Sequence, residues 1–163
     1  MMKEVKLQIT VYEADSIADL QEVDAALLKE AIKATQQSYA PYSKFNVGAA
    51  VLMENGEIIY GSNQENAAYP SGLCAERVAL FYANSHFPNV PVKAIAVNSA
   101  VNGKNNDDPV FPCGDCRQVL LECENRFGKP IKVIMGGVKN IKIVNSITDL
   151  LPLSFHLVVS DVY

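Results

Sequence analysis

Cys74-Ala75-Glu76-Arg77 is the stretch that decides how this chain folds, together with Pro112-Cys113-Gly114-Asp115-Cys116, which begins 36 residues after Glu76. Three cysteine thiolates can hold Zn²⁺ and leave one tetrahedral position open for water. A helix that begins near Cys74 places Cys74 and Glu76 in its first turn. A second helix that begins near Cys113 places Cys113 and Cys116 on one face, because residues i and i+3 are neighbours on a helix. Glu76, close to the metal but not bound to it, can then move protons.

The charge of such a site predicts a basic neighbour. Three thiolates around Zn²⁺ carry a formal charge of −1, which makes bound water a weaker acid. Arg77 follows Glu76 directly, and Arg117 follows Cys116 directly. We expect at least one of them to donate hydrogen bonds to a cysteine sulfur and so to tune the metal.

A closed structural zinc site is the simpler alternative, because the chain has a fourth cysteine, Cys123. On one helix Cys123 would lie about 10 Å from Cys116 at a rise of about 1.5 Å per residue, which is too far to share a metal. Cys123 is more typical of a small buried hydrophobic residue. Four cysteines among 163 residues do not suggest a disulfide framework either. The spacing therefore favours a catalytic zinc.

The two segments match the H-x-E and P-C-x-x-C motifs of zinc nucleobase deaminases, in the variant with three cysteines, where Cys74 stands in place of histidine. Over roughly residues 27 to 156 the chain resembles the small, homotetrameric, zinc-dependent cytidine deaminases. The further blocks that carry this resemblance are Tyr39-Ala40-Pro41-Tyr42-Ser43-Lys44-Phe45-Asn46-Val47-Gly48-Ala49-Ala50, Asn63-Gln64-Glu65-Asn66-Ala67, Arg117-Gln118-Val119-Leu120 and Leu150-Leu151-Pro152-Leu153-Ser154-Phe155.

The resemblance implies a reaction and a role for each matching residue. The reaction is the hydrolytic deamination of cytidine and deoxycytidine to uridine and deoxyuridine, by zinc-activated water and a glutamate proton shuttle, in pyrimidine salvage. It implies one zinc per chain and a homotetramer with sites near the subunit interfaces. The implied site residues are Cys74, Cys113 and Cys116 as zinc ligands, Glu76 as proton shuttle, Phe45 against the pyrimidine ring, Asn63 and Glu65 on the ribose 3′-hydroxyl, Ala75 donating its backbone N–H to the base, Arg77 beside the thiolates, and Phe155 closing a neighbouring subunit's site.

Without the resemblance, several of these residues have ordinary interpretations. Phe45 could be a core aromatic, and Asn63 with Glu65 could be the solvated edge of a strand. Asp115 stands where the family usually has a small residue, His156 stands where glycine is usual, and residues 102–109 form a long polar segment expected near the mouth of the site. These departures keep open a deaminase of a modified or antibiotic aminopyrimidine nucleoside of the blasticidin type. A non-catalytic zinc-stabilised binding protein is disfavoured, because a structural site has no use for Glu76.

Composition narrows the partners. The net charge is −4 and lysine and arginine are scattered, whereas proteins that grip polynucleotide backbones usually carry a basic patch. We therefore expect a free nucleoside as substrate and no polynucleotide. No run approaches the ~20 apolar residues of a membrane span, and no signal peptide is apparent at the N-terminus. A cytoplasmic location is the resulting expectation.

The pattern of apolar residues predicts an α/β fold with one mixed sheet and helices on both faces. The resemblance makes this a three-layer α/β/α domain with a five-stranded sheet over residues 27–163, preceded by an N-terminal extension over residues 1–26. Asn55-Gly56 predicts a hairpin turn. The expected helices are 16–38, 73–84 and 113–126, with a helical turn at 147–151. The expected strands are 47–53, 57–60, 92–98, 131–135 and 139–144, with a further strand at 6–12 in the extension.

Overall fold

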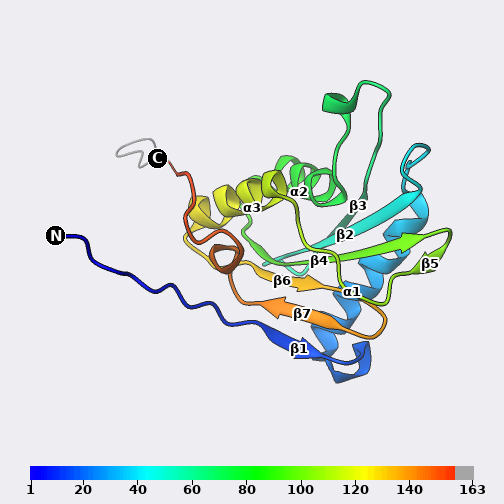
Figure 1. The fold of residues 1–163 in the computed structure, drawn as a ribbon. Coiled ribbons are helices and arrows are strands. Elements are labelled where there is room, and N and C mark those ends of the chain that lie inside the picture. Colours follow the sequence, from blue (N-terminus) through cyan, green and yellow to red (C-terminus); the bar gives the residue numbers. More distant parts are fainter. Residues whose placement is uncertain (157–163) are drawn as a thin grey trace.

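The structure is a computed structural model that describes residues 1–156. Its centre is one mixed sheet of seven strands in the order β1-β7-β6-β4-β2-β3, with β5 paired to β4 (Figure 1). All neighbouring strands are antiparallel except β4 and β6, which are parallel. The strands are β1 (Tyr12–Ala14), β2 (Phe45–Met53), β3 (Ile58–Ser62), β4 (Val92–Val101), β5 (Lys104–Asn105), β6 (Lys132–Met135) and β7 (Ile141–Val144).

Helices cover both faces of this sheet, so the predicted three-layer α/β class is confirmed. The helix α1 (Glu22–Ala34) packs on one face, where it buries Leu27 and Leu28. The helices α2 (Ala75–His86) and α3 (Gly114–Phe127) pack on the other face. Short 3-10 helices complete residues 1–156: η1 (Ile17–Asp19), η2 (Thr35–Gln37), η3 (Tyr69–Ser71) and η4 (Ile147–Leu150).

The long strand β2 shows how the sequence builds two cores at once. Ala49 and Val51 point into the core under α2 and α3, whereas Ala50 and Leu52 point into the core under α1. This alternation follows from the period of two residues along a strand. The predicted hairpin to β3 is present, and Gly56 in its turn has a φ of 90°, which glycine adopts without strain.

Two glycines let the helices come close to the sheet. A Cβ on Gly48 would lie 2.1 Å from the backbone oxygen of Ala31 in α1. A Cβ on Gly61 would lie 2.6 Å from the backbone nitrogen of Ala79 in α2. Any larger residue would push a helix away from the sheet, and at Gly61 that helix is the one that begins at Cys74.

The sheet has more strands than predicted. The five strands expected in the domain are present, and β1 and β5 are additional. The segment 6–12 was wrong as a strand, because β7 offers partners only to Tyr12–Ala14 and a strand needs a partner for its backbone. The helix expected over 16–38 is shorter: α1 is flanked by η1 and η2. The boundary proposed between residues 26 and 27 falls inside α1, and the division into extension and domain stays a prediction.

Candidate metal centre and active site

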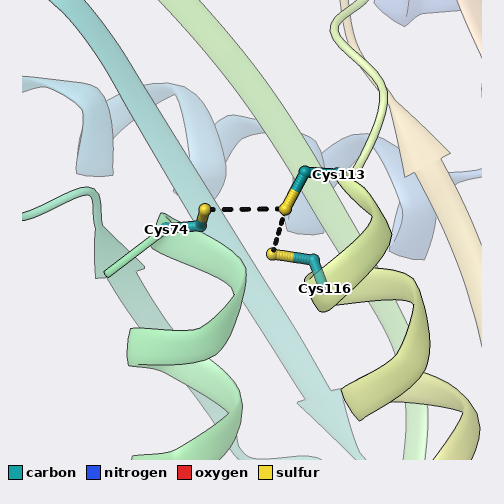
Figure 2. Close-up of side chains that lie close together, drawn as sticks. All are labelled: Cys74, Cys113 and Cys116. Carbon is teal, nitrogen blue, oxygen red and sulfur yellow. Dashed lines mark hydrogen bonds between the residues drawn. The ribbon is translucent and has the colours of Figure 1, made fainter. Parts of the chain in front are cut away.

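The helices α2 and α3, which share one face of the sheet, each begin at a cysteine. Cys74 is the N-cap residue of α2 and Cys113 is the N-cap residue of α3, each with an extended backbone. Cys116 lies in the first turn of α3 and is completely buried. Figure 2 shows the three sulfurs turned toward one another from the two helix starts. Helix N-termini favour negative charge, so this position stabilises thiolates.

The spacing of the three sulfurs fits a zinc ion. The Sγ atoms of Cys74 and Cys113 are 3.8 Å apart, and those of Cys113 and Cys116 are 3.5 Å apart. Two sulfurs that each lie about 2.3 Å from one tetrahedral zinc are about 3.8 Å apart. Among residues 1–156 these three form the one group of metal-ligating side chains close enough to share an ion. Cys123 lies elsewhere, buried, with its thiol directed to Asn84.

The thiols of Cys74 and Cys116 have pKa values shifted in opposite directions. Hydrogen bonds from Cys116, Arg77 and Cys113 lower the pKa of the Cys74 thiol to about 5, in spite of its partial burial. The pKa of Cys116 is raised, because it gives its hydrogen bond to the Cys74 sulfur and is itself buried. A soft metal cation would be the partner that lets all three cysteines ionise, and its binding would release protons.

Arg77 and Arg117, the two arginines beside the cysteine motifs, bond to different partners. Arg77 donates from Nη2 to Cys74 Sγ at 3.8 Å, and its Nη1 lies 3.9 Å from a carboxylate oxygen of Asp115. Arg117 instead donates to the backbone oxygens of Pro112 and Leu150, at 2.8 and 2.9 Å. Arg77 therefore supplies positive charge to the sulfurs, and Arg117 fastens the start of α3 to the end of η4.

Glu76 is a carboxyl group held away from water. Only 5% of the residue is exposed, and this burial, with the nearby Cys74 thiolate, raises the pKa of its carboxyl. A raised pKa brings a carboxyl nearer to neutrality, where it can both accept and return a proton. Glu76 stands two residues after Cys74 at the start of α2, beside the sulfur cluster.

A cavity of about 860 Å³ opens beside this cluster. Its size lies within the range of small-molecule sites. Its wall includes Cys74, Cys113, Glu76 and Arg77 at the metal end. It also includes four residues expected to touch substrate, namely Phe45, Asn63, Glu65 and Ala75. Phe155 is not part of this wall; it is 70% exposed, and its backbone oxygen accepts a hydrogen bond from Gln118.

Asn63 and Glu65 already have partners within the chain. Asn63 accepts at Oδ1 from the backbone N–H of Val47 and from Ser38, and donates from Nδ2 to the backbone oxygen of Phe45. Within residues 1–156 the other N–H of its amide has no partner and can serve a ligand. Glu65 accepts from the backbone N–H groups of residues 42 and 43 and from the Ser43 hydroxyl, and that hydroxyl is the main reason that its pKa is lowered.

The sequence motifs assign no role to several residues of the cavity wall. They are Tyr42, Ser43, Gln64, Asn66, Tyr69 and Phe111. Some belong to the quoted sequence blocks, so their neighbourhood was marked although no role was given to them. Val110 and Phe111, which directly follow the polar segment 102–109, line the cavity, whereas no residue of that segment is part of the wall. Asp115 and His156 are exposed and do not line it.

Comparison with known proteins agrees with this geometry. The family description "Cytidine and deoxycytidylate deaminase zinc-binding region" matches residues 21–128. A cytidine deaminase of Halalkalibacterium halodurans is 44% identical over 129 residues, which is 79% of this chain and 91% of that protein. A cytidine deaminase of Sporosarcina psychrophila is 42% identical over 130 residues, 79% and 88% of the two chains. The crystal structure of a cytidine deaminase from Burkholderia pseudomallei superposes with a TM-score of 0.68 at 38% identity, covering 83% of this chain and all of that one.

Proposed function

Because this chain belongs to the family of cytidine and deoxycytidylate deaminases, we propose that it hydrolyses cytidine and deoxycytidine to uridine and deoxyuridine and releases ammonia. The family match and the relatives named cytidine deaminase make it a zinc-dependent deaminase. They do not favour an antibiotic nucleoside as its substrate.

One observation carries the proposal: a buried carboxyl, Glu76, lies beside three convergent cysteine sulfurs at the end of a cavity large enough for a nucleoside. A structural zinc site closes its coordination with four protein ligands. Here three sulfurs come together, and two of their cysteines line the cavity, which a water molecule and a substrate can enter.

Cys74, Cys113 and Cys116 would hold the zinc, whose chemistry in such a site is to make water a nucleophile at neutral pH. The chain's own residues do the rest. Arg77 keeps positive charge beside the Cys74 sulfur and so offsets the charge of three thiolates. Arg117 keeps the first turn of α3 fixed through its bonds to residues 112 and 150.

Glu76 would move the protons of the reaction. Its carboxylate takes one proton from the attacking water and gives it to ring N3, while the water oxygen forms a bond to C4. It then takes the second proton from that oxygen and gives it to the amino group, the C4–N bond breaks, and ammonia leaves. One water is consumed for each ammonia released, so atoms and charge balance. Such positioned proton transfer contributes typically ~10²–10⁴-fold to a rate.

Four other residues that line the cavity would bind the nucleoside. Phe45 offers an aromatic face to the pyrimidine ring, and the backbone N–H of Ala75 can donate to the base. The free N–H of Asn63 and the carboxylate of Glu65 can bond the ribose 3′-hydroxyl. Support comes from the presence of all four residues in the lining of this cavity.

We further infer a homotetramer in which Phe155 closes the site of a neighbouring subunit. The exposed ring of Phe155, in a chain taken alone, is compatible with burial by another copy. The role would be pyrimidine salvage in the cytoplasm, whose reducing conditions keep the cysteines free to bind metal. Within residues 1–156, no helix has the length and apolarity that crossing a membrane requires.

An ultraviolet assay on metal-quantified protein tests the proposal. Cytidine, deoxycytidine, cytosine, adenosine and blasticidin S are offered separately. We expect rapid loss of the cytidine and deoxycytidine absorbance, with about one zinc per chain. Turnover of blasticidin S alone would replace the proposed substrate, and zinc without turnover of any compound would remove the catalytic role.

A further inference from the structure

Residues 1–11 form an extended arm that runs away from the body of the protein before β1 (Figure 1). Every residue of this arm is exposed. In the part of the chain that the structure describes, no strand pairs with it, because the ladder between β1 and β7 begins at Tyr12. The arm also precedes the residues that match the deaminase family. It is therefore a feature of this chain that the deaminase site does not explain.

The sequence of the arm is that of a strand. From Glu4 to Val11, apolar residues stand at alternate positions and the residues between them are polar. This alternation is typical of a β-strand with one buried face. The apolar row comprises Val5, Leu7, Ile9 and Val11, which are 72%, 59%, 49% and 40% exposed.

The arm leads directly into an open edge of the sheet. β1 is the last strand on its side, so the backbone groups on the side away from β7 have no neighbouring strand among residues 1–156. Open edges are templates for pairing with another chain. A strand laid beside β1 would lengthen the sheet and would continue along the arm.

We propose that the arm pairs antiparallel with the same arm of a second copy of this chain, across a two-fold axis at Gln8. In this register Leu7 lies opposite Ile9 of the second copy, and Val5 lies opposite Val11. Lys3 lies opposite Glu13, which already pairs with Lys142 of β7. The Glu13 carboxylate then lies between two ammonium groups, and all four apolar residues face apolar residues.

Charge selects this register over its neighbours. A shift of two residues in one direction sets Lys3 opposite Val11, and the opposite shift sets Glu13 opposite Val5. A shift of one residue brings the apolar row opposite the polar one, because side chains alternate between the faces. The arm is thus complementary to itself, which a two-fold contact requires.

The two paired arms form a two-stranded ribbon, and the sheet of each copy supports one end of it. An isolated two-stranded ribbon is only marginally stable in water. In the proposed register, residues 2–4 of one arm reach the open edge of Tyr12–Ala14 in the other copy, beside β7. Each end of the ribbon therefore becomes the next strand of a seven-stranded sheet.

A single cysteine at the axis tests the contact in the full-length, zinc-loaded protein. In Gln8→Cys the two sulfurs face each other across paired residues about 4.5–5.5 Å apart at Cα, within the range of a disulfide. We expect most of the protein to run as a linked dimer after mild oxidation, on electrophoresis without reductant. Glu4→Cys is the matched control, because its two copies would lie about 26 Å apart along the ribbon. The unmodified chain controls for the native cysteines.

A second variant separates specific pairing from chance collision. Leu7→Lys with Ile9→Lys, added to Gln8→Cys, places like charges across the ribbon and should abolish the crosslink. Hydrogen exchange of residues 5–11 should accelerate in the same variant. Deamination of cytidine should change less than twofold, because no arm residue lines the cavity.

Three results would overturn the proposal. Equal crosslinking of Glu4→Cys and Gln8→Cys would mean random encounter. A crosslink that survives the two lysines would mean that another contact brings the chains together. Slow exchange in the arm without any crosslink at Gln8 would mean that the arm occupies a different edge, such as β3. Each result leaves the deaminase activity, which is measured separately, untouched.

Discussion

The side chains at the two ends of the cavity differ in how many hydrogen bonds they make within the chain. At the metal end, the side chains of Cys74, Cys113 and Cys116 face one another, and hydrogen bonds from other groups to them are few. At the end where we propose that the nucleoside binds, Asn63 and Glu65 are bonded to the backbone of the strand and turn beside them. The first group is arranged for an atom from outside the chain. The second holds the shape of the wall before any ligand arrives, so its mutants should differ in kind from those of the first.

The largest effect on activity is expected at the three cysteines that would bind zinc. Cys113→Ala leaves two sulfurs, so we expect loss of zinc and of all measurable turnover. Metal analysis and the cytidine assay check this together. Cys123→Ala is the matched control, because its thiol lies outside the cluster, and it should keep one zinc per chain. A fully metallated Cys113→Ala variant would show that the ligands are assigned wrongly.

Glu76→Gln tests proton transfer separately from metal binding at the metal end of the cavity. The amide cannot accept the proton of water, so we expect kcat to fall by ~10²–10⁴-fold while zinc content and melting temperature stay close to those of the unmodified protein. Normal activity would remove Glu76 from the mechanism. Loss of zinc would mean instead that this residue supports the ligands.

At the nucleoside wall, Asn63→Ala should cost stability as well as activity. The change leaves the N–H of Val47 and the oxygen of Phe45 without their partner, at up to about 1–3 kcal/mol for each of these partly buried groups. We expect a lower melting temperature and a larger loss of kcat/KM on cytidine than on cytosine.

Glu65→Ala is the comparison for Asn63→Ala. The hydrogen bonds of Glu65 lie at the surface, where water can replace them, so its loss should weaken nucleoside binding with little change in melting temperature. If both variants melt like the unmodified protein, the wall is not held by Asn63. If cytidine and cytosine suffer equally, the pair does not read ribose.

The smallest effect is expected at Asp115, the acidic residue within the second metal motif. Its side chain is 77% exposed and meets Arg77 only at 3.9 Å. Exposed ion pairs contribute about 0–1 kcal/mol, so Asp115→Ala should alter kcat/KM by no more than a few fold. Arg77→Gln should cost about 10–100-fold, as is typical of groups that orient metal ligands. A larger loss at Asp115 than at Arg77 would give the acid a direct part in the site.

Much of the fold follows from local patterns. The hairpin at Asn55-Gly56 and the helices that begin at Cys74 and Cys113 were predicted to within about two residues, because turn residues and helical period act over short distances. The length of the first helix and the first strand were predicted less well. An edge strand exists only where its neighbour supplies partners, and β7 supplies them to Tyr12–Ala14 alone.

The contacts of the nucleoside wall could not be predicted. The motif predicts Asn63 and Glu65 as ligands for ribose, and it gives no sign that both bond to residues 16 to 25 positions away. Such bonds depend on how β3 and the segment after it lie against β2. That arrangement is set by strand register and by the packing of the helices.

By itself, the sequence determined which side chains the proposed chemistry would use. Cys113 and Cys116 share a helix face because of their spacing, and Glu76 follows Cys74 within one turn, so the donors and the acid are given by local geometry. Only the tertiary structure decided that they meet. Cys74 and Cys113 are 39 residues apart, and they come together because α2 and α3 pack side by side on the same face of the sheet. The burial that raises the pKa of Glu76 arises in the same way, from apolar packing that the motif does not contain.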